Sequence, residues 1–122
     1  MSQPKQVLVI DDNRDLGEVM RATVESAKMS CEVTTTVDEF LAALTAETSL
    51  ILMDMQMPEM NGRELLALLG AHYCPSGIVL MSGIGSGALK QAESFGRSLG
   101  LKMVGTLAKP FRVADLLAML RR

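Results

Sequence analysis

The chain has 122 residues, 48% of them hydrophobic, and a formal net charge of −2, which fits one globular domain with a single core. Three Phe, one Tyr and no Trp offer little aromatic surface for stacking on bases, and the negative charge disfavours nucleic acid or an anionic membrane as a partner. The first residues lack a basic-then-apolar signal, and no apolar run approaches the roughly 20 residues of a membrane span. We therefore expect a cytoplasmic protein.

The N-terminal third of the chain predicts two strands and two helices in alternation. Residues 7–10 form a continuous apolar run rich in β-branched side chains, typical of a strand that is covered on both faces. Apolar positions at helical spacing over residues 16–27 predict an amphipathic helix, capped by Asn13 or Asp12. The more polar run 31–36 predicts a second strand near an edge of the sheet, and residues 37–44 predict a short helix.

The rest of the chain continues the same alternation. Residues 50–53 predict a buried strand that ends at Asp54, and residues 78–81 predict another that ends at Ser82. A helix between them is expected to end near Gly70, and a helix after the second should close at Gly100. Three glycines, Gly83, Gly85 and Gly87, predict a flexible loop. A fifth strand (103–107) and a last helix (113–120) complete the chain.

Five strands, each followed by a helix, predict an α/β fold with a doubly wound parallel sheet, because the connections are too long for hairpins. In such sheets, ligands bind beyond the carboxyl ends of the strands. The unusual polar residues follow four of the predicted strands: Asp11, Asp12, Asp54, Ser82 and Lys109. We therefore expect these side chains to share one site.

The chemistry of this set indicates phosphoryl transfer. Carboxylates that lie close together repel one another, so Asp11, Asp12 and Asp54 predict a hard cation such as Mg²⁺. Lys109 supplies a positive charge for Asp54 or for a phosphoryl group, and Ser82 supplies a hydroxyl. Asp54 is then the carboxylate nucleophile of a phosphoryl-acceptor site. Each residue alone has an ordinary alternative as a helix cap, a turn residue or a solvated lysine.

Four motifs carry a resemblance to a known family: VLVIDD (7–12), ILMDMQMPEMNG (51–62), LMSG (80–83) and AKPF (108–111). With them the chain resembles the receiver domain of two-component response regulators over nearly its whole length. The resemblance implies a flavodoxin-like (βα)5 fold with strand order 2-1-3-4-5. It also implies that residues 1–122 form a single receiver domain, without an output domain in this chain.

The resemblance further implies how the site works. A histidine kinase or phosphotransfer protein would phosphorylate Asp54, and the domain would switch an output domain or partner without being a turnover enzyme. Magnesium would be bound by Asp12, Asp54 and the backbone carbonyl of Gln56, with Asp11 acting through water. The peptide bond between Lys109 and Pro110 would be cis.

One position departs from the family pattern. Receivers usually carry, three residues before the lysine, an aromatic side chain whose rotation relays the signal, and this chain has Thr106 there. We therefore expect the glycine-rich loop after Ser82 to be the moving part. Residues 100–107 resemble receivers attached to cyclic-di-GMP phosphodiesterase domains, which implies an output partner of that class.

Other functions fit the sequence less well. A haloacid-dehalogenase-type phosphatase needs a second Asp two residues after its nucleophile, where Gln56 stands, and a flavodoxin needs aromatic residues around its flavin. His72 and Cys74 are too few to indicate a metal site, and Cys31 and Cys74 are expected to be free thiols. A receiver-like docking module that is never phosphorylated stays the alternative.

Overall fold

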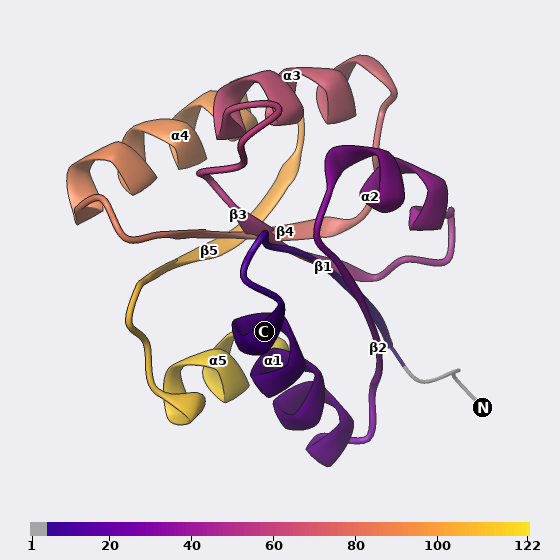
Figure 1. Ribbon diagram of the computed structural model, residues 1–122. Helices are drawn as coiled ribbons and strands as arrows, with labels where there is room; N and C mark the ends of the chain where they lie inside the picture. The colour runs from indigo at the N-terminus through magenta and orange to yellow at the C-terminus, as the bar shows by residue number, and fades with distance from the viewer. Residues whose placement is uncertain (1–4) are drawn as a thin grey trace.

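The computed structural model describes residues 5–122, and its strands and helices alternate along that range (Figure 1). The strands are parallel neighbours in one sheet, and the elements in chain order are β1 (Gln6–Ile10), α1 (Arg14–Ser26), β2 (Ser30–Thr34), α2 (Val37–Ala43), β3 (Leu50–Asp54), α3 (Gly62–Ala71), β4 (Gly77–Ser82), α4 (Ser86–Ser98), β5 (Lys102–Ala108) and α5 (Val113–Leu120).

The sheet has the order β2-β1-β3-β4-β5, which confirms the predicted topology. Helices α1 and α5 cover one face of the sheet, and α2, α3 and α4 cover the other (Figure 1). The order reverses direction between β1 and β3, because the chain first adds β2 on one side and then β3 to β5 on the other. A reversal of this kind opens a crevice at the carboxyl ends of the central strands.

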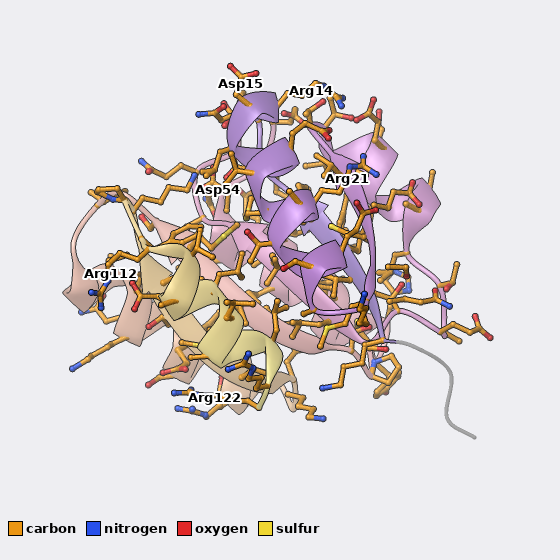
Figure 2. The ribbon with its side chains drawn as sticks, turned by 90° about the horizontal axis from the view of Figure 1, so that it is seen from below. Arg14, Asp15, Arg21, Asp54, Arg112 and Arg122 are labelled. Carbon is orange, nitrogen blue, oxygen red and sulfur yellow. The ribbon has the colours of Figure 1, made fainter. Side chains whose placement is uncertain are left out.

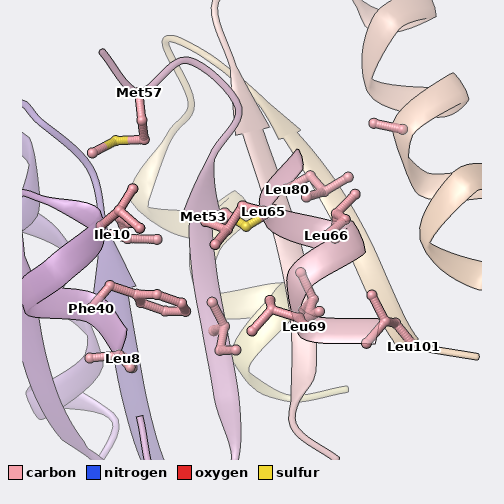
Figure 3. Packing of buried hydrophobic residues seen from close by; sticks show 14 of the residues in the cluster. Leu8, Ile10, Phe40, Met53, Met57, Leu65, Leu66, Leu69, Leu80 and Leu101 are labelled. Carbon is pink, nitrogen blue, oxygen red and sulfur yellow. The ribbon is translucent and has the colours of Figure 1, made fainter. Parts of the chain in front are cut away.

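Both faces of the central strands are buried, so the sheet separates two hydrophobic clusters. Successive side chains of a strand point to opposite faces. In β3, Ile51 and Met53 therefore pack under α2 and α3, whereas Leu50 and Leu52 pack under α1 and α5. Figure 3 shows the first cluster, in which the Phe40 ring lies beside the strands. Because neither face of such a strand contacts solvent, its sequence is a continuous run of apolar residues.

Side-chain caps fix where helices begin. The side chain of Asn13 accepts a hydrogen bond from the Leu16 N–H at 3.1 Å, which resolves the open choice between Asn13 and Asp12 for the cap of α1. Asn61 and Glu64 form a reciprocal capping box at the start of α3. Both caps follow a strand and its loop, so they hold the chain at the edge of the sheet where the polar residues lie.

Some local expectations were wrong. The second strand ends at Thr34, because Thr36 caps α2 by accepting a hydrogen bond from the Glu39 N–H. Val19 is 54% exposed although its spacing suggested the inner face of α1; the buried stripe of the helix is narrower than the apolar pattern. Gly87 lies inside α4 and not in the preceding loop.

Strand β2 lies at one edge of the sheet, as its polar sequence predicts. The Arg21 guanidinium, which comes from α1, donates a hydrogen bond to the Cys31 carbonyl of β2 at 3.1 Å. Glu32 in the same strand is exposed.

Over residues 5–122, no helix combines the length and hydrophobicity needed to cross a bilayer.

Candidate functional site

Four strands deliver polar side chains to the carboxyl edge of the sheet. Asp54 is the last residue of β3 and Ser82 the last of β4, whereas Asp11 follows β1 directly and Lys109 follows β5. The structure brings the side chains of Asp11, Asp54 and Lys109 into direct contact. The site is therefore built from segments that are up to 98 residues apart in the sequence.

Three carboxylates form the floor of the site. Asp11, Asp12 and Asp54 each offer an oxygen, and these oxygens all lie within 4.8 Å of one another. Asp11 and Asp54 are buried, and Asp12 is exposed. The backbone N–H of Asn13 donates to Asp11 Oδ1 at 2.9 Å, and that of Gln56 donates to Asp54 Oδ1 at 3.0 Å. These bonds fix the orientation of both buried carboxylates.

Lys109 neutralises part of this negative charge. Its Nζ lies 2.7 Å from Asp11 Oδ2 and 3.3 Å from Asp54 Oδ2, so one ammonium bridges two acids. Burial alone lowers the pKa of Lys109, but the hydrogen bonds and negative charges of Asp11 and Asp54 outweigh burial and raise the pKa above its usual value. Lys109 therefore stays charged. The peptide bond that joins it to Pro110 is cis, as predicted.

The Asp54 carboxylate is held in an unfavourable environment. Burial raises its pKa, and the neighbouring charge of Asp11 raises it further, against the opposing effects of the Gln56 N–H and Lys109. A carboxylate that is poorly compensated in this way gains from any additional cation. Binding of a cation at the site would therefore favour the ionised form of Asp54.

Ser82 lies on the neighbouring strand with its hydroxyl already in use. The backbone N–H of Ile84 donates to Ser82 Oγ at 3.0 Å, and Ser82 itself is 2% exposed. The hydroxyl keeps its own proton for donation to another acceptor.

Thr106, the position that departs from the family pattern, lies on β5. It pairs in register with Leu80 of β4 and is partly buried, so it lies two strands away from Asp54.

The donor set fits a magnesium ion. Mg²⁺ prefers oxygen ligands and binds through a few carboxylates while keeping several waters. One exposed and two buried carboxylates meet that description, and the exposed Asp12 leaves a route from solvent. Among residues 5–122, His72 and Cys74 join no such group of three ligands, and both cysteines are free thiols.

Sequence reasoning missed two features of the site. It predicted that Lys109 can pair with Asp54, a contact that the structure has at 3.3 Å, but it missed the shorter contact of Lys109 with Asp11 at 2.7 Å. It also overlooked Ile84, whose N–H fixes the Ser82 hydroxyl and whose side chain is 57% exposed beside it. No local pattern reveals either feature, because each depends on how neighbouring strand ends meet in space.

A five-stranded parallel sheet with a buried Asp, two further acids, a Lys and a hydroxyl at its carboxyl edge defines the receiver class of signalling domains. The family model described as the response regulator receiver domain matches residues 7–121. The chain belongs to this family.

Known proteins agree with that assignment. The C4-dicarboxylate transport transcriptional regulatory protein DctD of Rhizobium meliloti is 37% identical over 73 residues, which cover 56% of this chain and 16% of that protein. The transcriptional regulatory protein CpxR of Escherichia coli is 29% identical over 119 residues, covering 95% of this chain and 47% of CpxR. The structure of the chemotaxis response regulator CheY4 of Vibrio cholerae matches with a TM-score of 0.81 and 28% identity over 98% of both chains. The chain thus spans less than half the length of DctD and of CpxR.

Proposed function

We propose that Asp54 is the phosphoryl acceptor of this receiver domain and that a histidine kinase or a phosphotransfer protein is the donor. An Asp54 oxygen attacks phosphorus, the bond from phosphorus to the donor imidazole nitrogen breaks, and that nitrogen regains a proton. The observation that supports this role is the meeting of Asp54 with two further acids and Lys109 at one edge of the sheet.

The other side chains have distinct proposed roles. Asp12, Asp54 and the Gln56 carbonyl would hold Mg²⁺, with Asp11 acting through water, and the ion when bound offsets negative charge on the phosphoryl oxygens. Lys109 is near enough to Asp54 to contact a phosphoryl oxygen there, and Ser82 has a proton to donate to another. The domain thus acts as a stoichiometric switch that slowly loses its phosphate, not as a turnover enzyme.

Intact-mass measurement tests the proposal. With Mg²⁺ and acetyl phosphate, the mass should rise by one phosphoryl group, and peptide mapping should place that group on Asp54. The Asp54→Asn variant should gain nothing, and Asp38→Asn, an exposed acid on α2, should behave like the wild type. Phosphate on another residue, or an unchanged mass despite measured Mg²⁺ binding, would support the unphosphorylated docking module instead.

The wider setting of the domain stays a prediction. The kind of output domain is one such prediction. The resemblance of residues 100–107 indicates a cyclic-di-GMP phosphodiesterase domain, whereas DctD and CpxR are named as transcriptional regulatory proteins. The cytoplasmic location, the absence of a direct nucleic-acid or membrane partner and the single-domain organisation of residues 1–122 are likewise predictions.

A further inference from the structure

A second polar cluster lies at the amino ends of the strands, at the opposite end of the sheet from Asp54. Three cationic side chains, Lys5, Lys102 and Arg122, line a cavity of about 340 Å³ there. Arg122 lies at the end of α5 far from Arg112, as Figure 2 shows. The chain as a whole carries a net charge of −2, so this local excess of positive charge contrasts with the rest of the molecule.

The cavity has an apolar floor. Its remaining lining includes Leu50, Val104, Met119 and Leu120, and no Asp or Glu of the described chain contributes to it. Within residues 5–122, none of the three cationic side chains forms an ion pair with an Asp or Glu side chain. An apolar surface beside an excess of positive charge is complementary to a molecule with an anionic group and an apolar body.

A β-bulge holds Arg122 at this cavity. The register between β4 and β5 passes from Ile78 paired with Met103 to Val79 paired with Gly105, which leaves Val104 as an extra residue. Bulges break the ladder locally and redirect the chain. The Val104 carbonyl accepts a hydrogen bond from Arg122 Nη1 at 3.0 Å. The guanidinium is therefore positioned by the backbone, although Arg122 is exposed to solvent.

Lys5 and Lys102 lie beside Arg122 at the same end of the sheet. Lys5 Nζ donates a hydrogen bond to the main-chain oxygen of Arg122 at 3.5 Å, and Lys102 is the first residue of β5. Gly77, at the start of β4, lets the walls come close, since a Cβ there would lie 2.8 Å from Val104 Cγ2. Segments from both ends of the chain thus build one pocket.

We propose that this cavity binds a small amphipathic organic anion, a carboxylate or phosphate ester that carries a short apolar chain or ring. Its volume lies at the lower end of the range for small-molecule sites, so one small molecule fits and a folded partner does not enter. Among the described residues that line it there is no aromatic side chain, which disfavours a nucleotide base. The proposal is independent of phosphorylation at Asp54.

Octanoate is a suitable probe, and the methyl NMR signals of Met119 report on binding in the cavity. Met119 lines the cavity and packs with Leu120 and Val104 on the same face of the sheet, so its methyl signals should shift saturably when octanoate is added to the unphosphorylated protein. Octanol and acetate, which lack the charge and the chain respectively, should shift them much less. The double variant Lys102→Gln/Arg122→Gln should bind octanoate about tenfold more weakly.

The matched control removes the same charge elsewhere. Lys90→Gln/Arg121→Gln takes away two exposed cationic side chains that do not line the cavity, and its octanoate affinity should equal that of the wild type. Equal responses to octanol and octanoate, equal weakening in both double variants, or unshifted Met119 signals would overturn the proposal. A response to a hexaglutamate peptide but not to octanoate would overturn it in favour of an acidic protein partner.

Discussion

Lys109 donates its shortest side-chain hydrogen bond to Asp11, at 2.7 Å, although the two residues are 98 positions apart in the sequence. Asp11 has no exposed surface, so its charge is compensated mainly by this ammonium and by the Asn13 N–H. The same ammonium also contacts Asp54 Oδ2 at the longer distance of 3.3 Å. Removing the cation or removing one acid should therefore have opposite effects on stability.

Replacing Lys109 with Met should destabilise the metal-free protein. The change leaves two buried carboxylates without their shared cation, and breaking a buried ion pair from one side costs about 3 kcal/mol. Urea unfolding in chelator measures the loss, and Mg²⁺ should restore part of it because the ion takes over the compensation. Lys90→Met, an exposed site on α4, is the control and should change stability little. Equal losses in the two variants would show that Lys109 is not a structural cation.

Replacing Asp54 with Asn should stabilise the metal-free protein while weakening its binding of Mg²⁺. At neutral pH the substitution removes a buried charge that lies near Asp11, a gain on the order of 1 kcal/mol. Thermal unfolding in chelator would measure it. The exposed Asp12 gives the comparison, because Asp12→Asn should produce a smaller gain. An Asp54→Asn protein less stable than the wild type would mean that the acids do not repel one another.

The stability that Asp54→Asn gains over the wild type should also increase as the pH rises. The pKa of Asp54 is raised in the folded protein, so the unfolded chain releases this proton at a lower pH than the folded chain does. The wild type should therefore lose stability relative to the variant as the pH rises through the window that begins near the ordinary carboxyl pKa of 3.8. Below that window the two proteins should converge. Unfolding curves in chelator at several pH values would contradict this if the gap stayed constant.

Much of the fold follows from local sequence, because buried parallel strands leave an unmistakable signature. The runs before Asp11 and Asp54 are continuously apolar, since both faces of β1 and β3 are covered; the first run ends with its strand, and the second ends one residue before its strand does. The position of the polar residues at the sheet edge follows from the same alternation. Burial of helix faces is less predictable: Val19 and Leu41 fit the apolar spacing but lie beyond the contact with the sheet.

Which side chains contact one another at the site depends on the relative positions of the strand ends, and no local sequence pattern predicts these positions. Which acid lies nearer to Lys109 is decided by the relative positions of three strand ends. The cavity at Arg122 depends on a one-residue bulge at Val104, and nothing in the sequence of β5 marks which residue is left over. Sequence therefore predicts the set of residues at an edge better than it predicts their contacts.

Activation should change the segment after Ser82 more than β5. If Ser82 turns to donate its proton to a phosphoryl group, the Ile84 N–H bonded to its Oγ must follow or lose that bond, so the loop should adjust. Gly85 has a φ of 65°, and a Cβ added there would meet no described atom within 4 Å, which leaves the loop room to move. Hydrogen exchange with and without beryllofluoride compares residues 83–92 with residues 103–107. Larger protection changes in residues 103–107 would show that the signal travels by β5.

The two cysteines should differ strongly in reactivity. Burial raises the pKa of the Cys31 thiol to about 11, so very little thiolate is present near neutral pH, and the side chain is covered. Cys74 is only partly buried and should react first with a thiol reagent at about pH 8, close to the ordinary thiol pKa. Peptide mapping after partial alkylation measures the order, and Cys74→Ser should leave Cys31 unmodified until denaturant is added. Early labelling of Cys31 would mean that β2 opens readily.

The hydrogen bond from Arg21 to the Cys31 carbonyl also affects how copies of this domain behave at high concentration. An edge strand offers unpaired carbonyl and amide groups on which another chain can add a strand. Arg21 occupies one of these acceptors, and the exposed Glu32 places a charge along the same strand. Strand addition at β2 would have to displace the guanidinium and bring two Glu32 carboxylates toward each other if two copies met there. Arg21 and Glu32 thus oppose the addition of a strand at the β2 edge of the sheet.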